Sequence, residues 1–400
     1  MTESVTANMR ENGKTVKLFY QDSHLKEFEA KVVSCAKSGD HYEAELDCTA
    51  FFPEGGGQYA DTGTIGSVRV LDVQERDGRV LHITDGPLTP GETVTGRIDW
   101  EERFMKMQQH TGEHIVSGLV HARFGYNNVG FHLGSEDCTM DFDGEITPEE
   151  LREIEEKANR AVWADLDVQV LYPSEEELAK IEYRSKIEIE GQVRIVVIPG
   201  YDVCACCAPH VKRTGEIGVI KLTGVQRYKG GVRVTMLCGM RALADYAVKQ
   251  EQAGEISAML CAKQNEIAEA VTRLREECSE LKREIAEKEK QLVELRAEMI
   301  PDGEEVVCVF SREIGGESMR ALMNRVLEKE RKLCAVFHGD DREGYRYVIG
   351  SRKADLRGFV REFNAAFSGR GGGKPEMVQG TAKGSESEMR AWICEKAGRI

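Results

Sequence analysis

Hydrophobic and polar residues alternate in short runs over roughly the first hundred positions. The runs at residues 68–73 and 79–83 are separated by Asp77 and Gly78, a pair typical of a tight β-hairpin turn. Clusters of Gly, Pro and Asp interrupt the chain at short intervals, as they do where brief strands are joined by turns. The pattern predicts a small N-terminal β-barrel over residues 1–98.

The spacing of apolar residues changes after this region. Residues 100–124 have the periodicity of an amphipathic helix, and short apolar runs such as 194–198 predict strands. Thr147, followed by Pro148 and two glutamates, is a strong helix start, because Thr caps the end and Pro fits the first turn. We expect that helix to end near residue 166, within an α/β domain over residues 99–245.

A third pattern begins near residue 243. Apolar residues then recur mostly at alternating spacings of three and four, at Leu260, Ile267, Val271, Leu274, Cys278, Leu281, Ile285, Leu292 and Leu295. This heptad pattern predicts a long coiled-coil-like helix within residues 246–301, ended by Pro301 and Gly303. A single helix packed on a neighbouring domain, a helix folded back as a hairpin and a homodimer all fit the pattern. A homodimer would form through this helical segment or through the C-terminal domain.

Strand and helix patterns alternate again in residues 302–400 and predict a small C-terminal α/β domain. The predicted fold is therefore α+β and multidomain. One loop of the last domain contains Arg370, Gly371, Gly372, Gly373 and Lys374. Glycine backbone flanked by two cations can receive a phosphate, so these five residues are candidates for contact with a nucleic acid.

The composition limits the class of protein. Hydrophobic residues make up 41% of the chain, and twelve cysteines are too few for a disulfide scaffold of this length. Residues 1–14 are polar, without the apolar core of a signal peptide, and no apolar run approaches the length of a membrane span. We therefore expect a cytoplasmic protein without membrane contact.

The charge is uneven along the chain. A net charge of −15 argues against binding of nucleic acid by the whole surface. Residues 312–374, however, contain fourteen Lys and Arg against nine Asp and Glu, a local basic excess of five. Such a module is compatible with gripping a polyanion at one place.

Two pairs of residues have the spacing of metal ligands. His110 and His114 lie four residues apart in the helical pattern and therefore on one helix face. Cys206 and His210 share that spacing in a cysteine-rich loop about ninety residues later. Three nitrogens and one sulfur suit a single tetrahedral Zn²⁺. Cys204 and Cys207 remain rival ligands, because side chains of one short loop can exchange places.

A glycine-rich segment lies within the predicted barrel. It runs from Thr49 through Gly55, Gly56 and Gly57 to Gln58. Consecutive glycines let the backbone turn and come close to a ligand, and the flanking aromatic residues favour a shaped loop over a linker. The segment lacks the Lys-Ser/Thr ending of a phosphate-binding P-loop, so nucleotide binding is not implied.

Two functions fit the metal-ligand pattern by itself. The run His110-Thr111-Gly112-Glu113-His114 is an H-x-x-E-H sequence, which in zinc peptidases supplies two ligands and a glutamate base. Cys206 and His210 would instead complete a shell without an open position, and that is typical of structural zinc in a nonenzymatic RNA-binding protein.

A third function follows from resemblance. The glycine-rich segment, the His pair, the Cys/His pair followed by residues 214–218, and the terminal glycine motif resemble, in this order, the editing half of alanyl-tRNA synthetase. The chain more closely resembles the long form of the free-standing alanyl-tRNA editing proteins (the AlaX family), over nearly its whole length. The resemblance includes the coiled helix and a DHH-associated C-terminal domain. It implies a trans-editing hydrolase that deacylates mischarged tRNA(Ala), chiefly seryl-tRNA(Ala) and in some members glycyl-tRNA(Ala).

The resemblance also implies roles for single residues. It places one Zn²⁺ on His110, His114, Cys206 and His210, with Thr49 beside the substrate hydroxyl and His132 lining the site. We take Thr49, Gln58 and His132 as candidate catalytic residues, and the acceptor end of tRNA(Ala) as the expected partner. ATP-dependent charging is not expected. One departure is the sequence Cys207-Ala208-Pro209, where the synthetase pattern has Gly-Gly-Thr. The general base, the role of zinc and the preference between seryl and glycyl esters stay open.

Overall fold

The computed structural model describes residues 14–135, 137–185 and 192–398. We expected residues 1–14 to be polar and to lack a signal peptide. Of these, only Lys14 belongs to the described residues. The chain divides into two compact units, Met1–Gln252 and Ala253–Ile400, and the α+β multidomain class is confirmed. The finer division at residues 98, 245 and 301 stays a prediction. Within the described part, every helix is too short or too polar to cross a membrane.

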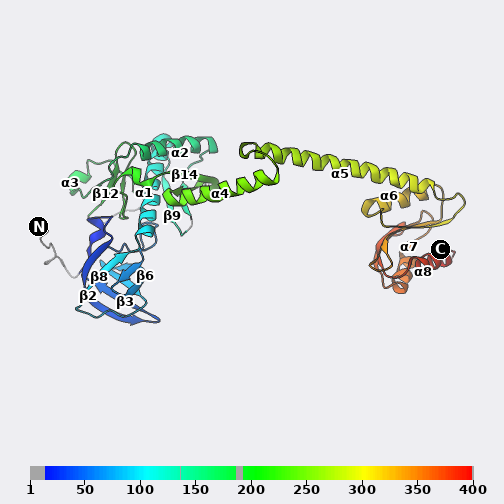
Figure 1. The fold of residues 1–400 in the computed structure, drawn as a ribbon, viewed down its shortest axis with the longest axis horizontal. Helices are drawn as coiled ribbons and strands as arrows, with labels where there is room; N and C mark the ends of the chain where they lie inside the picture. Colours follow the sequence, from blue (N-terminus) through cyan, green and yellow to red (C-terminus); the bar gives the residue numbers. More distant parts are fainter. Residues whose placement is uncertain (1–13, 136, 186–191, 399–400) are drawn as a thin grey trace. The chain divides into compact units, whose positions relative to one another are not determined.

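Six strands at the start of unit 1 form one sheet that closes on itself, in the order β2-β3-β7-β6-β5-β8 (Figure 1). They are β2 (Glu27–Ser38), β3 (His41–Leu46), β5 (Gly63–Ile65), β6 (Val68–Arg76), β7 (Arg79–Thr84) and β8 (Thr93–Ile98). The expected hairpin joins β6 to β7, and Asp77 and Gly78 have the positive φ angles, 54° and 76°, that its two-residue turn requires. A short β1 (Val16–Lys17) pairs in parallel with β4 (Cys48–Thr49) beside it.

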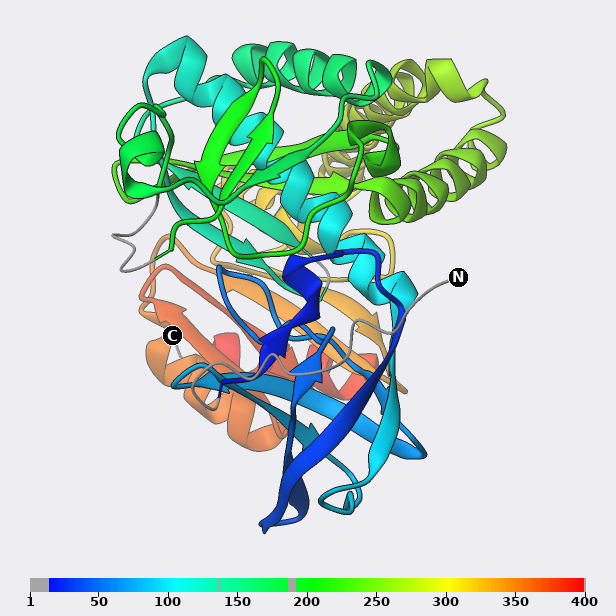
Figure 2. The ribbon, with the colours of Figure 1, turned by 90° about the vertical axis from the view of Figure 1, so that its left-hand side faces the viewer.

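Helix α1 (Trp100–Phe124) leads out of the barrel and packs against a four-stranded sheet and helix α2 (Pro148–Trp163) (Figure 2). The sheet contains β14 (Ile220–Tyr228), β15 (Gly231–Cys238), β10 (Cys138–Phe142) and β9 (Asn128–Leu133), in that order. The expected start of α2 is confirmed, since the Thr147 side chain accepts from the Glu150 N–H and the Glu150 carboxylate accepts from the Thr147 N–H.

A smaller three-stranded sheet brings the cysteine-rich loop to α1. It consists of β11 (Gln169–Leu171), β12 (Ile195–Ile198) and β13 (Asp202–Ala205), and the one-turn helix α3 (Glu175–Leu178) lies between β11 and β12 in the chain. Strand β13 packs beside α1, so the loop that follows it reaches the face of α1 that holds the two histidines. Helix α4 (Gly239–Met259) follows β15 directly.

Unit 2 contains a five-stranded sheet in the order β16-β17-β18-β20-β19, in which only β16 and β17 are parallel. The strands are β16 (Val306–Ser311), β17 (Leu333–Asp340), β18 (Gly344–Gly350), β19 (Arg370–Lys374) and β20 (Met377–Ala382). Helix α6 (Gly316–Leu327) covers one face, and α7 (Leu356–Ala366) and α8 (Glu386–Ala397) contribute to the core on the other. The terminal glycine motif is therefore not a loop, as the sequence suggested, but the edge strand β19.

The heptad pattern is realised only in part. Leu260 lies in a turn between α4 and α5 (Ile267–Glu298), so the pattern does not continue through one helix. Val293 and Ala297 of α5 pack into a core with α6, whereas Leu274, Leu281 and Ile285 are exposed. A helix packed on its neighbouring domain accounts for the C-terminal turns of α5, and dimerisation stays a prediction.

Candidate metal centre

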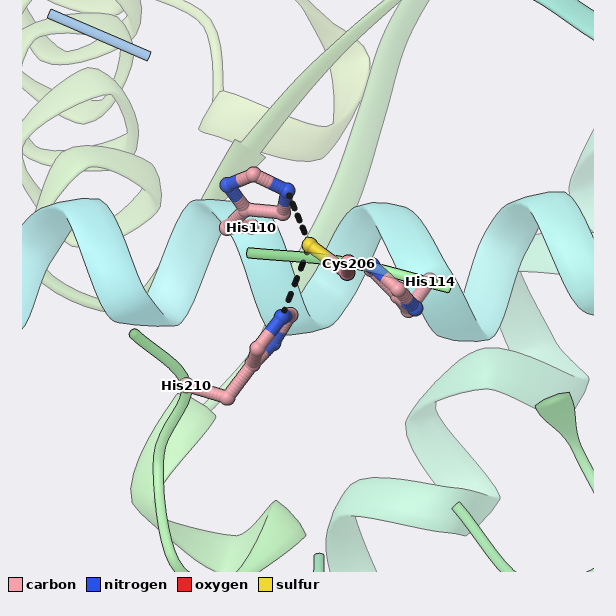
Figure 3. Close-up of side chains that lie close together, drawn as sticks. All are labelled: His110, His114, Cys206 and His210. Carbon is pink, nitrogen blue, oxygen red and sulfur yellow. Dashed lines mark hydrogen bonds between the residues drawn. The ribbon is translucent and has the colours of Figure 1, made fainter. Parts of the chain in front are cut away.

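Four side chains from two distant segments meet in unit 1: His110 and His114 from α1, and Cys206 and His210 from the loop after β13 (Figure 3). One ligand atom from each lies within 4.8 Å of the others. The sulfur of Cys206 is 3.5 Å from Nε2 of His110 and 3.4 Å from Nε2 of His210. The fold thus brings together all four residues that their spacing singled out.

The other ring nitrogen of each histidine is occupied by a neighbour. Nδ1 of His110 is 3.0 Å from Oε1 of Gln58, and Nδ1 of His114 is 2.9 Å from a carboxylate oxygen of Asp202. Both oxygens only accept, so both Nδ1 atoms carry the proton. Nδ1 of His210 lies 3.1 Å from the hydroxyl oxygen of Thr111. These contacts direct all three Nε2 atoms towards the cluster, as in metal sites whose histidines are oriented by outer hydrogen bonds.

The spacing of the ligand atoms fits a tetrahedral zinc ion. Bonds of about 2.0–2.1 Å to nitrogen and about 2.3 Å to sulfur place the two atoms about 3.5 Å apart in a tetrahedron. The measured separations of 3.4 and 3.5 Å between Cys206 and two histidines agree with that value. Two imidazole nitrogens and a thiolate at this distance, with a third imidazole beside them, form a donor set that zinc prefers.

The electrostatics favour the ligand forms of Cys206 and His210. Burial by itself raises the pKa of the Cys206 thiol, but the adjacent His110 and His210 lower that pKa well below its ordinary value. Burial also lowers the pKa of His210, to about 3, which keeps its imidazole neutral. A thiolate and a neutral imidazole are the forms that bind a metal ion. For His114, burial by itself lowers the pKa, but the hydrogen bonds to Asp202 and Cys206 raise that pKa well above its ordinary value.

The two rival cysteines lie elsewhere. Cys204 is buried and groups with His114 and Asp202, whose ligand atoms also lie within 4.8 Å of one another, and it does not belong to the group that contains His110 and His210. Cys207 is exposed and approaches the glycine-rich loop, because a Cβ added to Gly56 would lie 3.5 Å from its sulfur. Cys206 is therefore the cysteine that the fold offers to the three histidines.

The glycine-rich loop forms one wall of this centre. Gly56 and Gly57 have positive φ angles of 61° and 81°. A Cβ on Gly57 would collide with the carbonyl oxygen of Phe131 at 2.5 Å, so only glycine fits there. The Gly57 carbonyl in turn accepts from the N–H of Leu133 at 2.9 Å. The loop is thereby fastened to β9, and Gln58 extends from it to His110.

Thr49, which the resemblance placed beside the substrate hydroxyl, makes its hydrogen bonds within the barrel. Its side chain is fully buried, and its oxygen lies 2.9 Å from Nε2 of His82. Nδ1 of His82 is 3.1 Å from the Ala44 carbonyl and must donate to it, so Nε2 accepts the hydroxyl proton of Thr49. The Thr49 oxygen also accepts from the Phe51 N–H. Burial lowers the pKa of His82 to about 4, which keeps this arrangement neutral. The hydroxyl is therefore engaged within the barrel.

His132 also lies apart from the cluster. Its side chain is exposed, and it points towards Gly134, where an added Cβ would lie 3.3 Å from its Nε2. Its neighbour in β9, Phe131, contacts the ring of His110 with 4.7 Å between ring centroids. Successive residues of a strand face opposite sides, so β9 presents Phe131 rather than His132 to the centre.

Sequence reasoning missed several residues that build the site. Asp202 and Thr111 orient two of the histidines, and Arg194 donates to the carbonyls of Cys206 and Ala208 at 2.7 and 3.1 Å. Thr111 was within reach of inference because it follows His110 directly. Asp202 and Arg194 carry no local signal, since their partners are identified only by strand pairing and packing.

Three family models match parts of the chain. Residues 193–235 match the threonyl and alanyl tRNA synthetase second additional domain, and residues 303–393 match the DHHA1 domain. Residues 2–102 match the model of class II (A) tRNA synthetases. The first of these matches includes the whole cysteine-rich loop.

Individual relatives cover nearly the whole chain. An alanine–tRNA ligase of Pyrobaculum neutrophilum is 33% identical over 95% of this chain, which spans 44% of that protein. The alanyl-tRNA editing protein Aarsd1 of Rattus norvegicus is 28% identical, with 91% of this chain and 93% of the relative covered. The alanyl-tRNA editing protein AlaX-L of Pyrococcus horikoshii is 28% identical, with 95% and 98% covered. The chain thus spans less than half of the ligase and almost all of the editing proteins.

Replacement of single cysteines tests the ligand assignment. Cys206→Ser should weaken zinc binding by more than about tenfold, because it removes the thiolate that the histidines surround. Cys204→Ser and Cys207→Ser, two matched changes in the same loop, should retain the wild-type zinc content. Metal analysis of the purified variants and competition with a chelator measure the effect. Zinc lost from the Cys207 variant and kept by the Cys206 variant would reassign the ligand.

Proposed function

Since the chain belongs to the alanyl-tRNA editing family, we propose that it is an aminoacyl-tRNA hydrolase that acts on mischarged tRNA(Ala). Its chief substrate is seryl-tRNA(Ala), and glycyl-tRNA(Ala) is the second candidate. The observation that carries the proposal is the convergence of His110, His114, Cys206 and His210 beside the glycine-rich loop. The expected ion is Zn²⁺, which supplies Lewis acidity and a fixed positive charge at the ester.

Gln58 is the best candidate for direct contact with the ester. Its Oε1 atom accepts from His110, which leaves its Nε2 amide pointing elsewhere. That amide is buried and has no hydrogen-bond partner among the residues that the structure describes. Buried donors are nearly always paired, so an unpaired one beside a metal centre suggests a place for a substrate oxygen.

The reaction is attack of a water oxygen on the ester carbonyl carbon, followed by breakage of the bond to the ribose oxygen. The products are the free amino acid and tRNA with its terminal hydroxyl restored. In our proposal the Gln58 amide donates to the carbonyl oxygen as it gains negative charge, a contribution of about 3–4 kcal/mol where such donors have been removed. Phe131 and the glycine-rich loop shield the centre from bulk water.

The zinc-peptidase alternative has less support. In that mechanism Glu113 would activate water, but its Oε1 accepts from Ser117 at 2.7 Å and from Asn128 at 2.6 Å in the protein interior. Cys206 and His210 also occupy the positions that a peptidase leaves for a carboxylate ligand and water. The structural-zinc alternative gives no purpose to the unpaired amide of Gln58.

A tRNA grip is proposed for one face of the sheet in unit 2. Ser311, His338, Arg346, Thr381 and Arg370 are paired in one row across all five strands, so they face the same side. The row borders a hollow of about 840 Å³, and a second hollow of about 490 Å³ is lined by Arg320, Arg352, Gly372 and Lys374. A Cβ on Gly372 would meet nothing within 4 Å, so this face of β19 is open.

The cations of this face are available for phosphates. Arg320, Arg346, Arg352, Arg370 and Lys374 have no acidic partner at ion-pair distance within the described ranges. Arg320 donates to the side-chain oxygen of Gln379 at 3.1 Å. Unpaired cations around an open strand suit a sugar–phosphate backbone, which gives binding energy without reading sequence.

Deacylation assays test the proposed activity. The purified protein should hydrolyse seryl-tRNA(Ala) much faster than alanyl-tRNA(Ala), and His114→Ala should lose zinc and at least about hundredfold in rate together. Release of labelled serine, alongside metal analysis, measures both. Undiminished hydrolysis by zinc-free protein would reject a role for the ion. Cleavage of peptides would favour the peptidase, and tightly held zinc without either activity would favour the RNA-binding module.

Replacement of Thr49 separates support of the barrel from recognition of substrate. Thr49→Val should lower the free energy of unfolding by about 1–3 kcal/mol, because His82 and the Phe51 N–H lose a buried partner. The preference for the seryl over the alanyl ester should stay the same, since the hydroxyl is engaged inside the barrel. Thermal unfolding and the ratio of the two deacylation rates measure the outcomes. If the variant lost the preference for the seryl ester and kept the wild-type free energy of unfolding, Thr49 would instead be assigned to recognition of the substrate.

Charge removal on β18 and β19 tests the tRNA grip. The double variant Arg346→Gln, Arg370→Gln should lose about two phosphate contacts. The slope of log tRNA affinity against log salt concentration should therefore become shallower by about 2. Hydrolysis of a seryl ester of adenosine should be unchanged. Arg361→Gln on α7 removes a charge elsewhere in the same unit and should leave both quantities alone. Unchanged tRNA affinity in the double variant would assign this face another role, such as dimerisation.

A further inference from the structure

Two cations of α1 are buried completely and belong to no step of the proposed chemistry. The side chains of Arg103 and Lys106 are both 0% exposed, although Arg and Lys are almost never fully buried unless paired. They precede His110 by seven and four residues and therefore lie near the face of α1 that holds the metal ligands. Both point at the segment that carries Gln58.

Arg103 holds the two ends of that segment together. Its guanidinium donates to the Ala50 carbonyl at 2.6 Å and forms a fully buried ion pair with Asp61. The carboxylate of Asp61 also accepts from the Phe52 N–H at 2.7 Å, and the Asp61 N–H donates to the Phe52 carbonyl at 2.9 Å. These contacts hold residues 50–52 and residue 61, the two ends of the loop, next to each other. Arg103 attaches both ends to α1.

Lys106 holds the returning arm of the same loop. Its ammonium group donates to the Ala60 carbonyl at 2.5 Å and lies 3.9 Å above the ring centre of Tyr59. Its charge is balanced by Glu102 at 3.3 Å, with Asp61 at 3.7 Å. Two cations and two carboxylates therefore form a cluster with no net charge, in which burial of charge is tolerated.

The anchored residues adjoin Gln58 directly. Lys106 grips Tyr59 and Ala60, the next two residues of the chain, while Oε1 of Gln58 reaches His110 one helical turn beyond Lys106. The tip of the loop has only glycine backbone, which by itself is free to adopt many conformations. The position of the Gln58 amide relative to His110 is thus set by the grip of Lys106 on one side and the contact with β9 on the other.

We infer that Arg103 and Lys106 are positioning residues, which hold the glycine-rich loop in register with the metal ligands of α1 so that Gln58 orients His110. The inference deepens the proposed function and rests on it for the catalytic consequence. The orientation of His110 by Gln58 is a property of the fold and is measurable without catalysis. An apolar pair at these positions would fill the same space, but it would not bind the carbonyls that fix the register of the loop.

A double-mutant cycle tests the inference on the 400-residue chain. Lys106→Met keeps the length of the side chain and removes the ammonium group, and Gln58→Ala removes the contact to His110. Each should weaken zinc affinity by about tenfold, the lower end of what loss of an orienting partner costs. The double variant should bind zinc as Gln58→Ala does, because Lys106 acts through Gln58.

A spectroscopic measurement separates positioning from general support. The Nδ1 proton of His110, held by Gln58, should give a slowly exchanging ring N–H resonance in the zinc-loaded protein, and Lys106→Met should abolish it as Gln58→Ala does. Arg79→Met is the matched control, since it removes the ion pair of Arg79 with Glu45 in the same barrel, away from the loop. It should lower stability and leave the resonance and the zinc affinity unchanged. Lys106→Gln, which keeps a donor for the Ala60 carbonyl, is the conservative variant and should retain the resonance that Lys106→Met loses. If Lys106→Met does not fold, a folded Lys106→Gln protein that lacks the resonance would contradict the inference.

Three results would overturn the inference: wild-type zinc affinity in the Lys106 variant, a resonance that survives it, or losses that multiply in the double variant. Deacylation is measured in parallel, where the Lys106 variant should lower kcat about tenfold without changing KM for tRNA. A wild-type protein that does not deacylate tRNA would reject the proposed function alone, since the affinity cycle and the resonance decide the positioning role by themselves.

Discussion

The buried polar surface of α1 is the constraint around which unit 1 is built. Every residue from Lys106 to Gly118 is buried, and many of them are polar or charged. A polar group removed from water is costly unless it has a hydrogen-bond partner, and the surrounding elements supply partners for most of these groups; the side-chain oxygen of Gln108 is an exception among the described residues. Gln109 exchanges two hydrogen bonds of 2.8 Å with the backbone of Cys238, and Gln108 donates to the carbonyl of Glu216. The barrel, the cysteine-rich loop and the four-stranded sheet are thus each tied to α1 by specific contacts.

This arrangement makes assembly of the metal centre part of folding. The groups that satisfy His110, His114 and His210 come from three different segments, and each partner also orients a ring nitrogen towards Cys206. A misplaced barrel would leave a buried charge on Arg103 or Lys106 without its partner, which is a large penalty. The pairing of the buried charges of Arg103 and Lys106 therefore both fixes the position of the glycine-rich loop and brings that loop close to the metal ligands.

Unit 2 is held together mainly by apolar packing of helices against its sheet. Its sheet is packed between apolar faces of α6 on one side and of α7 with α8 on the other. The glycines of β19 allow close packing on one face of the strand and leave the other face accessible. A Cβ on Gly371 would strike the hydroxyl of Tyr347 at 2.5 Å, whereas Gly372 faces open space. An edge strand with three consecutive glycines presents its backbone and flanking cations without side chains in the way.

Local patterns predicted the elements and the ligand pairs, because they depend on spacing along one helix or strand. The hairpin at Asp77 and Gly78, the cap at Thr147 and the placement of His110 and His114 on one helix face are of this kind. Local sequence patterns predicted the wrong structure where contacts with other parts of the fold outweigh the local spacing of residues. Leu260 fits the heptad repeat but lies in a turn, and the glycine motif, which reads as a loop, pairs with β20 as a strand.

Tertiary structure decided which side chains share the site. Three cysteines within four residues are equivalent in spacing, and only the course of the loop after β13 brings Cys206 to the histidines. The resemblance implied site roles for Thr49 and His132, which stay predictions; in the fold the Thr49 hydroxyl contacts His82 inside the barrel, and the His132 side chain is exposed on β9. Asp202 and Lys106 were overlooked because a hydrogen bond between residues far apart in sequence leaves no trace in local periodicity. Its existence depends on long-range burial, which is known only once the chain has folded.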